Sequence, residues 1–306
     1  MIKETLKILG APLSLSALVV LTISCTQQDH YAVPDDVPEE DITSMPEWAK
    51  EAVWYQIMVE RFRDGDPDNN PTLETIDGSW PHDKPDTWQP TGWGHDWYAE
   101  EDWMQDSGGD FYEDVHMRRY GGDLQGVLDK LDHIEELGIN AIYFNPLNDS
   151  PSLHKYDPRS YHHIDVNFGP DPGGDRELIA QENPANPDTW QWTSADSLFL
   201  KVIREAHDRD IRVIMDYSWN HTGSEFWAFR EVIENQEDSE FKDWYNIYSF
   251  DDEEEGFEFS YQKWAGVPEL PEFQVFDGPE EIPHAESYKG NLHPELKRHI
   301  FAVTNR

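Results

Sequence analysis

Residues 123–144 read DLQGVLDKLDHIEELGINAIYF and combine a helical pattern with a strand pattern. In the first part, apolar residues recur at the three- and four-residue spacing of one helix face: Leu124, Val127, Leu128, Leu131, Ile134 and Leu137. Asp123 is a candidate N-cap and Gly138 a candidate C-terminal stop. The apolar run 139–144 follows at once. We therefore expect a helix that leads through a short joint into a buried strand.

The same pairing recurs along the chain. Residues 198–206 carry a second apolar helical stripe, and the apolar run 211–215 follows it. An earlier run, 52–59, is apolar, aromatic and β-branched, as in a buried strand. Short helix-to-strand joints and long strand-to-helix connections (61–122 and 145–196) indicate parallel β/α units of an α/β fold. Because the carboxyl ends of parallel strands hold the chemistry in such folds, we expect these connections to build a site.

Composition and charge narrow the classes of function. The chain has 306 residues with 23 Lys+Arg and 63 Asp+Glu, a formal net charge of −40. This acidity argues against a nucleic-acid partner, because the phosphate backbone requires a basic surface. The 13 Trp, 13 Tyr and 14 Phe supply material for a core, and the single cysteine excludes an internal disulfide framework. We interpret the acidity as adaptation to a salt-rich habitat, where screening reduces self-repulsion.

The N-terminus has the pattern of a secretion signal. Two lysines precede the apolar run 8–21, which is too short and too interrupted by Ser and Pro for a membrane span. The run closes at Cys25, so we expect residues 1–25 to be a bacterial lipoprotein signal peptide and 26–50 a flexible tether. The protein would then sit in the cell envelope, on the periplasmic or surface side, with lipid on Cys25 as its only membrane contact. The alternative is an ordinary signal peptide with an incidental cysteine.

Polar and aromatic side chains gather after the second and third expected strands. The segment 145–157 ends in His-Lys-Tyr-Asp, and the segment 216–221 reads DYSWNH. Hydrogen-bonding groups beside aromatic rings suit a sugar, whose hydroxyls need polar partners and whose C–H face stacks on a ring. The alternative is that Asp and Asn only cap the strand ends around a buried tyrosine.

Five motifs occur in a fixed order along the chain: VWYQI…ERF (53–62), YGGDLQG (120–126), HKYD (154–157), ID…FG (164–169) and D…NH (216–221). In this order they resemble the α-amylase family (glycoside hydrolase family 13). HKYD and GGDLQG are similar to the motifs of its neopullulanase and cyclomaltodextrinase group, and so is WAGVPELP at 264–271. The resemblance covers residues 51–306.

The resemblance implies a (β/α)8 TIM barrel, of which this chain would carry the N-terminal part, about three of the eight β/α units. Domain B would be inserted after strand three, at about 222–285. The implied substrate site has Tyr156 stacked under the sugar in the −1 subsite, with His154 and Asp157 in the same pocket. His221 would hydrogen-bond the hydroxymethyl group of that sugar, and Asp216 would brace the strand end.

The loop at 64–70, DGDPDNN, is dense in hard oxygen ligands, which suit calcium. The resemblance implies that Ca2+ is held by this loop together with the Gly-Gly-Asp turn. Its implied ligands are Asp64, Asp66, Asn69, Asn70, Gly121 and Asp123, with Asn220 as a further candidate. The alternative is ordinary turn chemistry in an acidic chain.

The implied activity is hydrolysis of α-1,4-glucans (starch, maltodextrin or cyclodextrin) by a retaining double displacement. In the family the nucleophilic Asp and the acid/base Glu follow strands four and five. The chain ends at Arg306, in a helix expected from Pro294, so we expect no catalytic carboxylate within it and no activity from it alone. The alternatives are an α-glucosidase or transglycosylase of the same family, or a surface glycan-binding lipoprotein without catalysis.

Five tryptophans crowd the first long connection. They form either a platform for longer glucans or packing that stabilises a large loop. They are Trp80, Trp88, Trp93, Trp97 and Trp103.

Overall fold

The computed structural model describes residues 45–275 and 292–306. The expected signal peptide with Cys25, the expected tether up to residue 44 and the end of the expected domain B from residue 276 lie outside these ranges. Within the described ranges, no helix combines the length and the apolar character that crossing a bilayer requires.

The main sheet is parallel and three-stranded, with the strands in the order β1-β2-β3. Trp54 pairs with Ala141, and Ala141 pairs with Arg212, so the three strands are in register. The strands are β1 (Trp54–Ile57), β2 (Ala141–Phe144) and β3 (Arg212–Met215). Neighbouring strands that follow one another in sequence are the arrangement expected for the first part of a β/α barrel.

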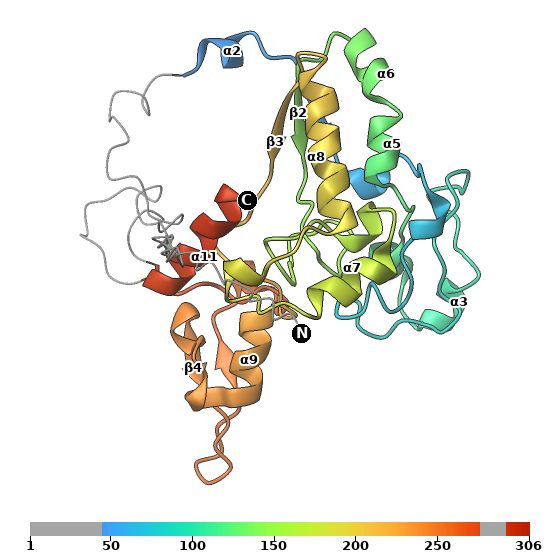
Figure 1. Cartoon of the computed structure of the whole chain (residues 1–306). Helices are drawn as coiled ribbons and strands as arrows, with labels where there is room; N and C mark the ends of the chain where they lie inside the picture. Colours follow the sequence, from blue (N-terminus) through green and yellow to red (C-terminus); the bar gives the residue numbers. More distant parts are fainter. Residues whose placement is uncertain (1–44, 276–291) are drawn as a thin grey trace, which may run out of the picture.

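The helices lie along one side of the sheet and within the connections (Figure 1). The α-helices are α2 (Glu47–Lys50), α3 (Met104–Ser107), α4 (Phe111–Asp114), α5 (Leu124–Leu128), α6 (Leu131–Glu136), α7 (Pro172–Ile179), α8 (Ser194–His207), α9 (Trp227–Asn235) and α11 (Pro294–Asn305). The 3-10 turns are η1 (Val59–Arg61), η2 (Pro67–Asn69), η3 (Val115–Met117), η4 (Val166–Phe168), η5 (Pro187–Thr189), η6 (Gln236–Asp238), η7 (Lys242–Trp244) and η8 (Trp264–Gly266). A small antiparallel pair consists of β4 (Ile247–Ser249) and β5 (Ser260–Tyr261).

The helical stripe before β2 is split into α5 and α6, whereas the spacing predicted one helix. Its start is as predicted, because the Asp123 side chain caps α5 by accepting from the Gly126 N–H. Its end is also as predicted, because Gly138 adopts a left-handed φ of 76° just before β2. Between the two helices Lys130 leaves helical geometry (φ −112°, ψ 1°). The carboxylate of the preceding residue, Asp129, accepts hydrogen bonds from the side chains of Gln125 and Arg63. The prediction of a continuous helix was therefore wrong.

α8 is the longest helix of the described chain and covers one side of β2 and β3 (Figure 1). A capping box fixes its start, in which Thr193 and Asp196 bond each other's backbone N–H groups. Its apolar stripe joins the sheet and α5 in the main core, which includes Val202, Phe199 and Phe144. The prediction of a helix followed by a strand is confirmed here.

Two further cores support the connections. An aromatic core joins α9, α11 and the β4–β5 pair, which project below the sheet in Figure 1, and it includes Phe229, Trp244 and Phe273. A smaller core lies inside the connection from β1 to α5 and contains Trp88 and Trp103. Those two tryptophans are 6% and 1% exposed, so they pack the loop.

Candidate functional site

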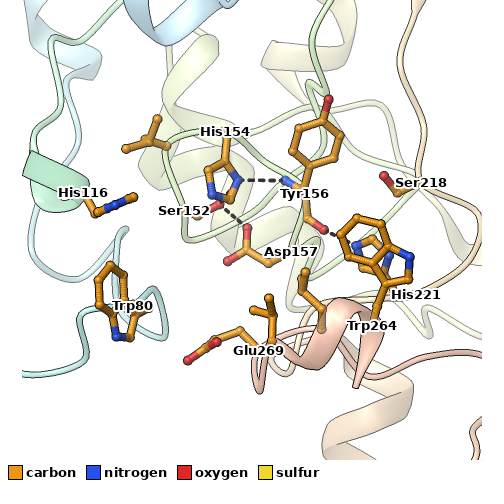
Figure 2. A pocket seen from close by; sticks show the side chains of 13 residues that line it. Trp80, His116, Ser152, His154, Tyr156, Asp157, Ser218, His221, Trp264 and Glu269 are labelled. Carbon is orange, nitrogen blue, oxygen red and sulfur yellow. Dashed lines mark hydrogen bonds between the residues drawn. The ribbon is translucent and has the colours of Figure 1, made fainter. Parts of the chain in front are cut away.

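A pocket of about 530 Å³ lies among the segments that follow the three central strands. It contains four of the five residues predicted for the sugar site: His154, Tyr156, Asp157 and His221. The long connections thus meet at the carboxyl ends of the strands, as predicted. In Figure 2, Trp80 and His116 stand on one side of the pocket, and Trp264 with His221 stands on the other.

A buried ion pair shapes the turn that carries His154, Tyr156 and Asp157. Lys155 has a left-handed φ of 63°, which turns its neighbours toward the pocket while its own side chain points back into the protein. Its Nζ lies 2.6 Å from Asp165 Oδ2 and donates to the Ser150 carbonyl at 3.1 Å. Because both charged side chains are less than 10% exposed, the loss of either partner would leave a buried charge unpaired.

Ser152 joins the two titratable groups at the bottom of this turn. Its hydroxyl donates to Asp157 Oδ1, and its oxygen lies 3.0 Å from His154 Nδ1. Burial raises the pKa of Asp157 to about 6. Burial, together with the cation of Arg119, lowers the pKa of His154 to about 4. At neutral pH the pocket therefore presents a carboxylate beside an uncharged imidazole.

Tyr156 connects β3 with the wall of the pocket. Its hydroxyl donates to Asp216 Oδ2 at 2.7 Å, so Asp216 contacts the site through Tyr156 although it does not line the pocket. His221 Nε2 donates to the Tyr156 carbonyl at 2.9 Å. The Trp264 ring stacks on the His221 ring, with the ring centroids 4.9 Å apart and an angle of 23° between the planes.

The opposite wall comes from residues that the sequence did not single out as ligands. His116 packs edge-on against Trp80, with 4.9 Å between the ring centroids. Glu269 enters from the segment after β5 and is held by His82, whose Nε2 lies 2.9 Å from Glu269 Oε1. Their only sequence signals were the tryptophan-rich connection around Trp80 and the WAGVPELP segment that holds Glu269.

The charge of the pocket favours a neutral ligand. Among the described residues, no Lys or Arg lines it. Burial lowers the pKa of His116, His154 and His221, so all three are uncharged at neutral pH. Aromatic rings and uncharged polar groups beside Asp157 and Glu269 suit a polyhydroxylated molecule and disfavour an anion.

The second predicted site, in the loop 64–70, packs against the start of α5. Asp123 Oδ2 accepts from the N–H groups of Gly65 and Asp66 at 3.1 and 2.8 Å, and from Asn69 Nδ2 at 3.3 Å. The Asp66 side chain accepts from the Asp68 N–H at 3.2 Å, which is turn chemistry. Asp123 therefore ties the loop together as a hydrogen-bond acceptor.

Three other oxygens of this cluster have no such partner. Asp64 Oδ1, Asn69 Oδ1 and Asn70 Oδ1 are buried without a hydrogen bond to any described residue. A Cβ on Gly121, whose φ is 71°, would lie 1.7 Å from Asn70 Oδ1, so only glycine leaves this oxygen its place. Unpaired buried oxygens of carboxylate and amide type fit a hard cation such as calcium.

Asn220, the further candidate, has its contacts elsewhere. Its Oδ1 lies 3.0 Å from His221 Nδ1, and its carbonyl accepts from the Phe273 N–H. Asn220 thus joins the end of β3 to the wall of the pocket at His221 and to the segment after β5.

The fold and the pocket together define a class, the β/α-barrel proteins that bind their ligand at the carboxyl ends of the strands. Within this class, the chain belongs to the α-amylase family: residues 56–181 and 193–290 match the family described as "Alpha amylase, catalytic domain". The predictions of the family and of an α/β fold that forms part of a barrel are confirmed.

Named relatives agree with this assignment. Neopullulanase 2 of Thermoactinomyces vulgaris is 35% identical over 268 residues, which are 87% of this chain and 33% of that relative. Cyclomaltodextrinase of Geobacillus thermopakistaniensis is 30% identical over 263 residues, 86% of this chain and 32% of that relative. A solved cyclic α-maltosyl-(1→6)-maltose hydrolase of Arthrobacter globiformis, in complex with maltose, is 27% identical with a TM-score of 0.50, over 75% of this chain and 39% of that one. The chain spans about a third of the length of these two sequence relatives.

Proposed function

We propose that the whole protein hydrolyses α-1,4-glucosidic bonds in starch, maltodextrin or cyclodextrin. The observation that carries the proposal is the aromatic-walled pocket, lined by no Lys or Arg of the described residues, that holds His154, Tyr156, Asp157 and His221 at the carboxyl ends of the strands. The names of the relatives, neopullulanase and cyclomaltodextrinase, support the same class of substrate.

In this proposal the residues of the chain bind and orient the sugar. The Tyr156 ring stacks on the C–H face of the sugar, and its bond to Asp216 fixes the ring plane. Asp157 accepts from a sugar hydroxyl. His221 lines the same pocket, and to bind the hydroxymethyl group of the sugar it would exchange its bond to the Tyr156 carbonyl or to Asn220 Oδ1. A retaining mechanism needs a nucleophilic and an acid/base carboxylate about 5–5.5 Å apart. We propose that residues beyond this chain supply both, since the matched relatives are about three times as long.

The test measures hydrolysis by the full-length protein. Incubation with maltotriose, maltodextrin and β-cyclodextrin should release maltooligosaccharides and glucose that chromatography separates. Proton NMR, recorded before mutarotation, should show the α-anomer as first product. No cleavage of any of these substrates, or a β-anomer as first product, would overturn the proposal. Binding of maltodextrin without cleavage would favour the glycan-binding alternative.

We propose calcium as the cation of the loop 64–70, on the basis of the three unpaired buried oxygens of Asp64, Asn69 and Asn70. Bound there, it would hold the connection after β1 against α5. Calcium should raise the melting temperature of the wild type and leave that of Asp64→Ala unchanged. The control is Asp86→Ala in the same connection, which should keep the response. An equal response of wild type and Asp64→Ala would contradict the assignment.

We also propose that the protein is a lipid-anchored component of the bacterial cell envelope, because its only cysteine closes the apolar run. Labelled palmitate should enter the wild type and not Cys25→Ala. Incorporation that survives this substitution would rule out the anchor.

A further inference from the structure

Three buried side chains outside the sugar pocket converge on one point. Nε2 of His162 and Nε2 of His163 lie 3.1 and 2.9 Å from Oε2 of Glu182. Their three ligand-type atoms all lie within 4.8 Å of one another, and each side chain is at most 1% exposed. Zn–N and Zn–O bonds of about 2.0–2.1 Å place neighbouring ligands of a tetrahedron about 3.3 Å apart, so a small expansion would seat an ion.

The other polar atoms of the same side chains are already engaged. His162 Nδ1 lies 2.9 Å from Ser160 Oγ, and His163 Nδ1 lies 2.9 Å from Asp196 Oδ2. The remaining oxygen of Glu182, Oε1, accepts from the Gln191 N–H at 2.5 Å. Ligating histidines in metal sites bond a carboxylate or another polar group through the second ring nitrogen in this way, which fixes the ring orientation.

From this arrangement we propose that His162, His163 and Glu182 form a binding site for a first-row transition-metal ion, with Zn2+ as the ion that fits best. Two imidazole nitrogens with one carboxylate oxygen suit zinc, and they distinguish this site from the all-oxygen cluster at 64–70. None of the three ligands lines the sugar pocket.

The site lies in the connection from β2 to α8, next to α8 and α11. Trp190 covers His162, with the ring centroids 4.0 Å apart and the planes at 11°. A separate pocket of about 310 Å³ is lined by His162, His163 and Asp196 together with residues of α8 and α11, and Arg306 Nη2 lies 2.9 Å from Asp196 Oδ2 beside it. A bound metal would link the segment after Asp157, which carries His162 and His163, to the loop after α7, which carries Glu182. The metal would then stabilise the connection that carries Tyr156.

The test is zinc binding by the full-length protein after dialysis against a chelator, in excess calcium so that the oxygen cluster does not compete. Titration against a chromogenic zinc chelator should show one equivalent bound, and Co2+ should give visible d–d absorption at the same stoichiometry. His162→Gln and Glu182→Gln should each weaken zinc binding by at least about 100-fold, since even supporting residues contribute 10- to 100-fold. His207→Gln, an exposed histidine of α8, is the matched control and should bind like the wild type.

Melting curves give a second measurement that does not depend on an affinity assay. Zinc should raise the melting temperature of the wild type and of His207→Gln, because it binds only the folded state. It should not raise that of Glu182→Gln, whose fold circular dichroism would verify. Wild type that binds no zinc, or variants that bind as tightly as the wild type, would overturn the proposal and leave a hydrogen-bonded His–His–Glu network.

Discussion

At the scale of single residues, Tyr156 makes two contributions that substitution can separate. Its ring lines the pocket and its hydroxyl binds Asp216. Tyr156→Ala removes the ring and should weaken maltoheptaose binding at least about tenfold, the effect of losing about 1.4 kcal/mol of stacking. Tyr156→Phe keeps the ring and should change affinity only a few-fold. Stopped-flow tryptophan fluorescence before turnover would measure both affinities.

Tyr112→Ala is the control for this pair, because Tyr112 is 76% exposed on α4 and does not line the pocket. It should bind like the wild type. If Tyr156→Ala also bound like the wild type, the ring would not contact the sugar.

His154 makes the protein sensitive to acid. The pKa of its imidazole is lowered by burial to about 4 in the folded protein, against an ordinary value of 6.5. Its contribution to stability is therefore complete above pH 6.5 and is lost as the pH falls toward 4. Between pH 7 and pH 5 the loss should be about 2 kcal/mol, and His154→Gln should remove it. Urea unfolding at both pH values would measure the difference.

Asp157 acts in the opposite direction, because burial raises the pKa of its carboxyl to about 6 and favours the folded state as the pH falls. Wild type and His154→Gln both contain Asp157, so the difference between their pH dependences of stability measures the contribution of His154 alone. His133→Gln, an exposed histidine of α6, should keep the slope of the wild type. Equal slopes for wild type and His154→Gln would contradict the role of His154.

The sequence allowed the prediction that residues of the segments after β2 and β3, such as Tyr156 and His221, meet in one pocket. His221 lies six residues after the end of β3 and Tyr156 twelve residues after the end of β2, so predicting the two strands brings both segments to the same edge of the sheet. Glu269 and His116 reach the same pocket through long connections, and only the tertiary fold brings them there. His163 and Glu182 meet for the same reason, since 18 residues of irregular loop and α7 separate them.

At the scale of elements, close backbone contact fixes the connection after β1 against α5. A Cβ on Gly126 would lie 2.0 Å from the Arg63 carbonyl oxygen, so Gly126→Ala forces the two segments apart. We expect a loss of about 2–3 kcal/mol in the free energy of unfolding. Gly173 in α7 has no atom within 4 Å of an added Cβ, so Gly173→Ala should stabilise by up to about 1 kcal/mol.

Urea unfolding of the two variants would compare helical glycines that differ only in their surroundings. A similar change in both would mean that helix propensity alone decides the result and that the contact with Arg63 contributes nothing. A loss confined to Gly126→Ala would locate the strain at this junction.

Element prediction succeeded where side-chain periodicity and local caps agree, as at α8, with its capping box and apolar stripe. It failed at the junction of α5 and α6, because the apolar spacing continues through residues 129 and 130 although the backbone does not. Lys130 leaves helical geometry there, and the side chain of Asp129 binds Arg63 of the connection after β1 at 3.3 Å, a contact that periodicity does not contain.

At the scale of the whole molecule, several of the few basic side chains are buried in the protein. Lys155 is paired with Asp165, and the fully buried Arg118 lies 3.1 Å from Glu101. They cannot screen the exterior, where runs such as 251–255 expose five acidic side chains in succession. With a net charge of −40 on the chain, such exposed carboxylates should repel one another in dilute buffer.

Salt should consequently stabilise the protein. The Debye length falls from about 10 Å at 0.1 M to about 3 Å at 1 M, so added NaCl screens repulsion between neighbouring carboxylates. We expect a gain of about 1 kcal/mol, roughly 2–4 °C in melting temperature for a chain of this size. Replacing Glu253, Glu254 and Glu255 by Gln should raise the melting temperature in low salt and reduce the gain from NaCl. If screening is the cause, the gain in melting temperature should level off as the NaCl concentration rises. Exclusion of salt from the protein surface would instead give a gain that grows in proportion to the NaCl concentration. A melting temperature equal in salt-free buffer and in 1 M NaCl would show that the acidic surface does not limit stability.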